Sequence, residues 1–474
     1  DCTPTGLLPC NMPVKDNLEG WHWRERITNF EPSWFTIVMS VSHDEQLTRG
    51  ASLTVDKGTG TLQQCFVNFP YPISGANRWL RDIGYCLWIL DIVLFGFFTG
   101  MLAWRYITHP VLFKKNMMEF PLSSFLGAIP ISFNTIIQGI ISYYDYRTSA
   151  RWAVFAMYWV ALVMSLGVSF GLVIYQMSKA KPQKLSDVAG VWVMTTVPLF
   201  LTASTAGTIL PFVYMESTKC AIALLVTGFL AWSFAIAEAT IIITIYFFRL
   251  IADKTPAAPL MVGSFLPVAA MSQGAFAIHK FGIFLATYIK DGYAPTQVSP
   301  PPLPMSTLQA TSEVIHWIGI IMDLFLLAHA TFWVVQGTTS VLVSLPKLQF
   351  NIAYWSSVFP MASYANAWCF LSRDLRDDGM RGWAATMVMI ATLLWLFCAL
   401  ETVYRGFWQG SLFSAPGLED WLGDKEQDEK SRGGRKDKWN GTYSMPQPGS
   451  QDEESGQANG HQSNDNEGDS RRRN

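Results

Sequence analysis

The stretch GAIPISFNT, at residues 127–135, sets a pattern that returns three more times along the chain. Each copy places a proline in an apolar segment and follows it, three to six positions later, with small polar side chains. The other copies are TTVPLFLTAS at 195–204, SFLPVAAMSQ at 264–273 and SVFPMASYAN at 357–366. The prolines are Pro130, Pro198, Pro267 and Pro360, at intervals of 68, 69 and 93 residues. The two nearly equal intervals indicate an internal structural repeat, and the proline-rich loop at 291–306 lengthens the last one.

Composition places the repeat in a membrane. Half of the 474 residues are hydrophobic and only 15% are charged, against about 25% charged residues in soluble proteins. Crossing a bilayer takes about 20 mostly apolar residues, and ten segments meet this condition. They are 34–68, 83–107, 119–144, 150–177, 187–213, 219–251, 259–285, 311–342, 350–375 and 382–408. We therefore predict an all-α, polytopic membrane protein with ten transmembrane helices.

The four prolines fall on the third, fifth, seventh and ninth spans, which all cross the membrane in the same direction. The repeating unit is then a helical hairpin, and parallel repeats of this kind are related by an axis along the membrane normal. Five hairpins would place five kinked helices around a central pore and five straight helices outside. A proline within a helix leaves a carbonyl without its donor, which a membrane tolerates where the backbone lines a cavity or meets another helix.

Hydroxyl and amide groups are the expected selectivity device, because freed carbonyls repel anions whereas these groups donate hydrogen bonds. A pore lined by neutral donors suits an anion that must both enter and leave. The donor candidates are Asn134, Thr202, Ser204, Ser272, Gln273, Ser363 and Asn366. The alternative is that these groups only hold neighbouring helices together.

Charged residues within the spans are few. Asp91, Glu238, Asp323 and Glu401 fall on even-numbered spans, so we interpret them as hydrogen-bond partners between helices. His279 and Lys280 lie beyond the proline of their span and either attract anions at the outer mouth or extend their polar ends to the interface.

The sequence contains no G-x-G-x-x-G, no P-loop and no H-E-x-x-H motif, and its seven cysteines form no C-x-x-C pair. We expect no enzyme activity, no cofactor and no metal. A net charge of −2 without a basic stripe gives no indication of nucleic-acid binding.

The first predicted span is interrupted by VSHDEQLTRGASLTVDK at 41–57, which is too charged to lie in hydrocarbon. The segment begins Val-Ser, which GTGAGT or GTAAGT would encode, and its removal joins two apolar pieces into one span. We interpret 41–57 as a retained intron, with a genuine loop between two half-helices as the alternative. We further predict a cytoplasmic segment at 1–30, a transporter domain at 31–410 and a disordered polar tail at 411–474.

Basic residues in the loops after the second and fourth spans place both termini in the cytoplasm by the positive-inside rule. These residues are Arg105, Lys114, Lys115, Lys179, Lys181 and Lys184.

Several stretches resemble one known family. They are NFEPSWFTIVMS, FVNFPYP, WLRDIGY, GAIPISFNTIIQGI, VPLFLTASTAGTILP, MSQGAFAIHKFG and YWSSVFPMASYANAW, and together they cover about residues 30–408. The chain is similar to the tellurite-resistance and dicarboxylate transporter family, within the voltage-dependent anion channels, which includes fungal sulfite efflux pumps, malic acid permeases and plant slow anion channels. The resemblance implies ten helices around a pore, in some members a homotrimer, and a phenylalanine gate at Phe359, beside Pro360. The 41–57 insertion and the polar pair His279-Lys280 depart from the family pattern.

The resemblance favours the sulfite efflux branch, because FVNFPYP, ASTAGT and WSSVFPM are closest to it. We therefore expect export of sulfite across the plasma membrane, with the lipid bilayer and a small anion as partners. A permease for malate or other C4-dicarboxylates is the alternative, and Lys280 is the intramembrane cation that a dianion would favour. A membrane scaffold or receptor without transport is the alternative from another class.

We predict that the mature transcript lacks the codons for residues 41–57, because their removal restores an uninterrupted first span. Sequencing the transcript measures this directly. A mature message that retains these codons would contradict the intron interpretation and leave the loop between half-helices.

Overall fold

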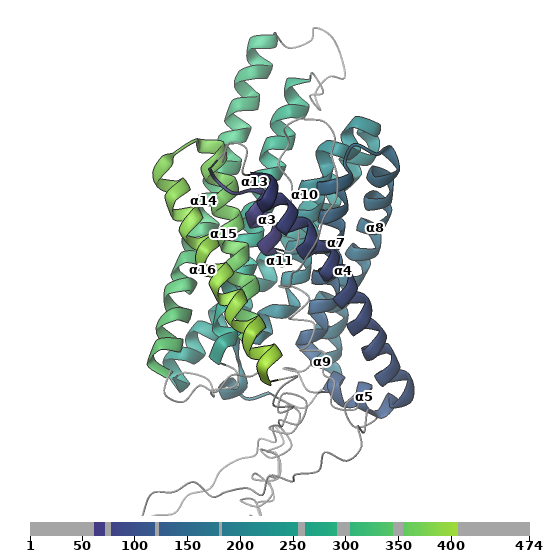
Figure 1. The fold of residues 1–474 in the computed structure, drawn as a ribbon, viewed down its shortest axis with the longest axis vertical. Coiled ribbons are helices and arrows are strands. Elements are labelled where there is room, and N and C mark those ends of the chain that lie inside the picture. The colour runs from purple at the N-terminus through teal and green to yellow at the C-terminus, as the bar shows by residue number, and fades with distance from the viewer. Residues whose placement is uncertain are drawn as a thin grey trace, which may run out of the picture. The chain divides into compact units, whose positions relative to one another are not determined.

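The computed structural model describes residues 61–71, 77–118, 123–179, 183–254, 261–291, 304–344 and 354–405. All of them belong to one compact unit, residues 1–422, and every regular element among them is a helix (Figure 1). The all-α prediction is confirmed. The segments predicted at 1–30, 41–57 and 411–474 lie outside the described residues.

The long helices pair in chain order into hairpins, as the repeat predicts. The pairs are α3 (Thr61–Val67) with α4 (Asn77–Thr108), α7 (Ala128–Tyr144) with α8 (Thr148–Leu166), α10 (Val197–Glu216) with α11 (Thr218–Asp253), α13 (Leu266–Lys290) with α14 (Met305–Ser344), and α15 (Trp355–Leu375) with α16 (Asp378–Val403). The shorter elements are α5 (Pro110–Met118), η2 (Phe125–Gly127), the π-helical η3 (Gly167–Leu172), α9 (Val173–Lys179), η4 (Leu185–Asp187), η5 (Gly190–Thr195) and η6 (Val262–Phe265).

Burial alternates between the two members of each hairpin. In the spans that contain α7, α10 and α13, 78–89% of the most apolar window is buried, against 28–39% in those of α4, α8, α11, α14 and α16. Most of α15 and most of α3 are buried as well. We call α3, α7, α10, α13 and α15 the inner helices, and their hairpin partners the outer helices.

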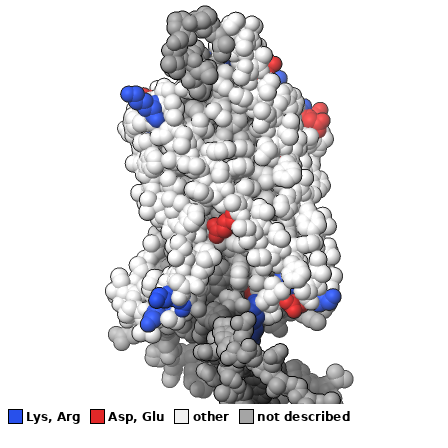
Figure 2. Space-filling view, turned by 180° about the vertical axis from the view of Figure 1, so that it is seen from behind, with Lys and Arg blue, Asp and Glu red and all other residues white. Residues whose placement is uncertain are grey.

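The outer helices face a medium that is not water. They expose large apolar side chains, among them Phe97, Val163 and Phe325, which are 57–69% exposed. Figure 2 shows a broad band of uncharged surface with Lys, Arg, Asp and Glu gathered near its two ends and one acidic patch between them. Such a band is what a bilayer would cover.

Eight helices among the described residues are long and apolar enough to cross a membrane. Helix α15 is long enough but more polar, because it is enclosed by other helices and not by lipid. Of the first predicted span, only the part from residue 61 is described. The chain is therefore polytopic, and its predicted total of ten spans stays a prediction.

The inner helices contact one another in the order α7, α10, α13, α15 and α3. The Gln63 amide of α3 then donates a hydrogen bond to the Tyr143 hydroxyl of α7 at 2.9 Å, which closes the circle. The hairpins therefore stand around a common axis, as the parallel repeat predicts.

The four prolines are predicted to lie within helix interiors, but only one of them does. Pro360 is within α15, but Pro198 and Pro267 lie in the first turn of α10 and α13, and Pro130 is the third residue of α7. A first-turn proline loses no hydrogen bond, because the N–H it lacks has no partner within the helix. The prediction of a mid-helix position with a freed carbonyl is therefore wrong for Pro130, Pro198 and Pro267, where a 3₁₀ segment precedes the α-helix. A further interior proline, Pro211 of α10, was not predicted.

Glycines let these 3₁₀ segments approach one another backbone to backbone. A Cβ atom placed on Gly190 of η5 would lie at a colliding distance from the carbonyl oxygen of Gly263 in η6. A Cβ on Gly127 of η2 would lie 2.5 Å from the carbonyl oxygen of Met194. Both distances are too short for any side chain, so glycine is required where the inner segments cross.

We predict that Gly190→Ala destabilises the protein by about 1–3 kcal/mol, the usual cost of overpacking a tight interior. The control is Gly96→Ala on outer helix α4, where the added Cβ meets no atom within 4 Å and a helix interior gains about 0.5–1 kcal/mol. Melting temperatures of the detergent-purified proteins measure the difference. Equal melting temperatures for the two variants would contradict the close packing of η5 on η6.

Candidate functional site

The seven predicted donors are all buried and all belong to inner helices. Each is at most 1% exposed, and all belong to α7, α10, α13 or α15. Their partners decide whether they only hold helices together or also leave polar groups for a ligand.

The contact between α7 and α10 carries two amides. Asn134 Nδ2 donates to Thr202 Oγ1 at 3.1 Å and to the Pro130 carbonyl at 2.9 Å. Gln138 Nε2 donates to Thr205 Oγ1 at 2.7 Å and to Ser204 Oγ at 3.3 Å. The two repeats therefore meet through the same part of their sequence.

A residue from outer helix α8 joins this contact. Ser165 and Thr202 share a hydrogen bond between their hydroxyls at 2.8 Å. Ser165 lies just before the π-helical turn η3, and Ser169 within that turn donates to the Thr195 carbonyl. Ser165 thus joins α8 to α10, and Ser169 joins η3 to η5.

The remaining contacts use α15. Gln273 Nε2 of α13 donates to Ser363 Oγ at 3.0 Å. Asn366 Nδ2 donates to Gln64 Oε1 of α3 at 2.7 Å, and Asn68 Nδ2 donates to Asn366 Oδ1 at 2.9 Å. Gln64, Asn68 and Gln138 were not among the predicted donors. Gln64 and Asn68 lie at the end of the one span that the charged insertion interrupts, and Gln138 lies eight residues after Pro130, beyond the three to six positions of the repeat.

Several buried polar atoms of the inner helices have no hydrogen-bond partner in the described part of the chain. Among them are Asn134 Oδ1, Gln138 Oε1, Gln273 Oε1 and Ser272 Oγ. Leaving such an atom unsatisfied costs about 1–3 kcal/mol, and an unsatisfied group in a native interior calls for a cause such as a water or an ion. The interior of the ring is therefore polar beyond what helix packing needs.

Two cationic side chains lie towards the C-terminal ends of α13 and α15. The Lys280 ammonium is 4.8 Å from the ring centre of Phe276 and 4.6 Å from that of Phe370. The Cβ of Lys280 packs against Gly207 of α10, so its side chain starts between inner helices. Arg373 donates to Asn68 Oδ1 at 3.3 Å, which links it to the Asn366 amide.

Phe359 is 1% exposed and lies in α15, one residue before the interior Pro360. Phe359 belongs to the cluster of buried hydrophobic residues and lies between Ser357 and Ser363 in the sequence of α15. Its role as a gate stays a prediction.

The acidic residues on even-numbered spans mostly meet inner elements. Asp91 accepts a hydrogen bond from Thr135 at 2.7 Å, and Glu238 accepts one from Thr195 at 3.1 Å. Asp323 meets His279 of α13, whereas Glu401 pairs with Arg405 one turn along. The interpretation as inter-helix partners is confirmed for Asp91, Glu238 and Asp323.

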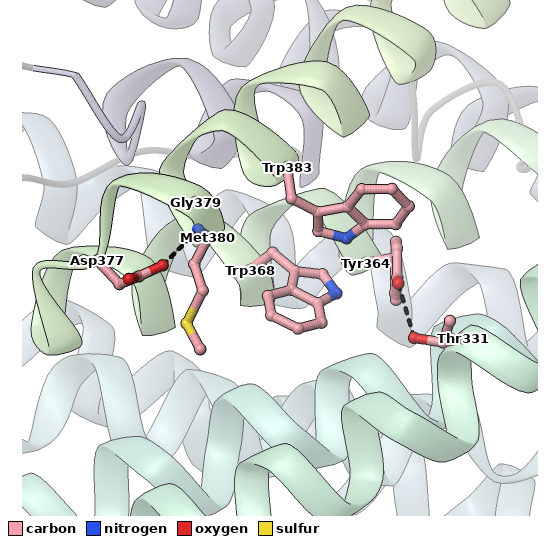
Figure 3. Close-up of a pocket in the computed structure, with 7 residues that line it drawn as sticks. All are labelled: Thr331, Tyr364, Trp368, Asp377, Gly379, Met380 and Trp383. Atoms are coloured by element: carbon pink, nitrogen blue, oxygen red, sulfur yellow. Dashed lines mark hydrogen bonds between the residues drawn. The ribbon is translucent and has the colours of Figure 1, made fainter.

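A pocket of about 370 Å³ lies on another part of the molecule, between α14, α15 and the start of α16. Figure 3 shows Trp368 and Trp383 on its wall, with the Tyr364 hydroxyl bonded to Thr331 and the Asp377 carboxylate bonded to the Met380 amide. The wall is mainly apolar and includes two outer helices, so the pocket is unsuited to a small anion.

Comparison with known proteins also indicates a protein that handles anions. The family model of the voltage-dependent anion channel matches residues 29–403. The sulfite efflux pump SSU1 of Arthroderma otae is 23% identical over 386 residues, covering 80% of this chain and 91% of that protein. The pump of the same name from Saccharomyces cerevisiae is 24% identical over 357 residues, covering 65% and 75%.

A relative with another printed name matches a shorter region. The malic acid transport protein of Schizosaccharomyces pombe is 22% identical over 195 residues, covering 39% of this chain and 37% of that protein. The family match spans all five hairpins and includes every donor of the inner ring. The chain belongs to the voltage-dependent anion channel family.

Proposed function

We propose that this protein exports sulfite across the plasma membrane, along the axis enclosed by the inner helices. The observation that carries the proposal is the set of unpaired buried polar atoms on α7 and α13, in a ring whose outer surface is apolar. The sulfite efflux pumps that resemble the chain over most of their length support sulfite as the anion.

The buried amides can bind an oxyanion if each amide group rotates so that its N–H groups face the anion. A glutamine amide carries a carbonyl oxygen on one side and two N–H donors on the other, and a hydroxyl both donates and accepts. Gln138 and Gln273 now direct Nε2 at hydroxyls and leave Oε1 unpaired. Rotating each amide by half a turn keeps a hydrogen bond to the hydroxyl and presents N–H groups to the axis. Ser272 adds a hydroxyl donor of the same kind.

Neutral donors of this type bind an anion without trapping it. Lys280 and Arg373 supply positive charge near one end of the ring, which raises the local concentration of anions. Asn134, Thr202, Ser204, Ser363 and Asn366 line the same contacts and hold the inner helices at the spacing that the path needs. Pro130, Pro198 and Pro267 fix where the inner α-helices begin.

Phe359 is the proposed gate. It is a large, buried apolar side chain of an inner helix, and Pro360 next to it removes a backbone hydrogen bond and eases local bending of α15. An apolar constriction blocks ions by excluding water, and movement of one phenylalanine would open the path.

Malate and related C4-dicarboxylates are the second candidate. The resemblance to a malic acid transport protein favours it, and Lys280 is the charge that would hold a dianion. The proposed placement has both termini in the cytoplasm, residues 31–410 as the transporter domain and the exposed faces of the outer helices in contact with lipid or with other subunits of a homotrimer.

Expression in cells that lack their own sulfite exporter tests the function. We expect sulfite tolerance and measurable sulfite export from the chain without residues 41–57, and little from the chain that retains them. Malate uptake in the same cells separates the second candidate. Absence of both activities from a surface-located protein would contradict transport and favour a scaffold or receptor.

Phe359→Ala in the exporting form tests the gate. We expect increased or leaky anion conductance, because the apolar block is removed while the donors remain. The matched control is Phe397→Ala on outer helix α16, a 45%-exposed phenylalanine that should leave conductance unchanged. A conductance equal to the parent in both variants would contradict the gate.

A further inference from the structure

Three helices bring a cluster of histidines and carboxylates together near one end of the ring. It comprises His279 of α13, His316 and Asp323 of α14, and Asp374 of α15. The proposed anion path does not use these residues.

The cluster forms a continuous chain of contacts. His279 Nδ1 lies 2.7 Å from Asp323 Oδ2, and His279 Nε2 lies 3.0 Å from Asp374 Oδ2. His316 Nε2 lies 2.7 Å from the same Asp374 oxygen. Two imidazole nitrogens from different helices thus converge on one carboxylate.

We propose that His279, His316 and Asp374 form a binding site for a divalent transition-metal ion of the zinc class. Their ligand atoms all lie within 4.8 Å of one another. Two imidazole nitrogens and one carboxylate oxygen are a recurring zinc ligand set, with bonds of about 2.0–2.2 Å and a fourth position open to water or an anion. Small side-chain rotations bring the three atoms onto one ion.

Asp323 gives the site the support that metal-binding histidines need. A ligating histidine commonly donates its other ring N–H to a carboxylate, which fixes the tautomer and the ring orientation. Asp323 is fully buried and holds His279 Nδ1, which leaves Nε2 directed at Asp374 and His316. The opposite wall is apolar, with the Phe370 ring centre 4.9 Å from that of His279.

The site also has an entrance and a favourable charge. His279 is buried, but the side chains of Asp374 and His316 are 24% and 35% exposed, so an ion can arrive from that side. The negative charges of Asp323 and Asp374 together equal the charge of a divalent cation. Lys280 is the next residue, but its ammonium lies over the rings of Phe276 and Phe370. A bound ion would tie inner helices α13 and α15 to outer helix α14.

Metal binding to the purified full-length protein in detergent tests the site without any transport assay. Calorimetric titration with Zn²⁺ should show one specific site, and Co²⁺ should give the visible absorption of a four-coordinate histidine complex. His316→Ala and Asp374→Asn should abolish both signals, and Asp323→Asn should weaken affinity about 10–100-fold. Zinc should raise the melting temperature of the parent protein, since it binds the folded state.

The control variant is His329→Ala, which removes a half-buried histidine of the same helix whose Nε2 accepts a hydrogen bond from Trp333. It should bind zinc like the parent. No binding by the parent, or binding that survives both His316→Ala and Asp374→Asn in monodisperse protein, would overturn the proposal, the latter by placing the ion elsewhere. His316 is partly exposed, so its removal should be tolerated even if Asp374→Asn destabilises the fold.

Discussion

The need to satisfy buried polar groups within the protein governs this architecture. A membrane offers no water to an amide in its interior, so each such group must find a partner on a neighbouring helix. Lipid is as apolar as leucine, so apolar contact alone gives helices little reason to associate. The hydrogen bonds of Asn134, Gln138 and Asn366 to adjacent helices supply that reason. Polarity in the centre and an apolar exterior are two consequences of one constraint.

Close backbone approach complements these bonds. Gly190 and Gly127 allow the 3₁₀ segments before the inner helices to touch. Gly274 of α13 packs against the ring of Phe200 of α10, where an added Cβ would lie only 2.8 Å from the ring. Hydrogen bonds fix which helices are neighbours, and glycines fix how near they come. The amide oxygens that remain unpaired mark where this polar interior has hydrogen-bonding groups that the helix contacts do not use.

The repeat could be predicted from sequence because it is a matter of order and period. The hairpins, the alternation of inner and outer helices and the burial of all seven donors follow from where Pro130, Pro198, Pro267 and Pro360 stand. The meeting of Asn134 with Thr202 also follows, since both residues are four positions after their proline.

Other features could not be predicted, because they depend on three-dimensional register. No local signal shows that Pro198 and Pro267 begin α-helices after a 3₁₀ segment. His279 and Asp374 are 95 residues apart and on different spans, so their contact is invisible to any spacing rule. Gln64 and Asn68 belong to the one span whose pattern is broken, and their pairing with Asn366 appears only once α3 is packed on α15.

A path for anions along the axis of the inner helices is the central claim, and thiol accessibility measures that path directly. In a Phe359→Ala chain without its seven native cysteines, single cysteines at Ser204 and Ser363 are compared with cysteines at Val163 and Phe325, which face outward. The account predicts that a water-soluble anionic thiol reagent modifies the first pair and spares the second. Unreactive inner positions, or faster modification at the outer ones, would contradict it.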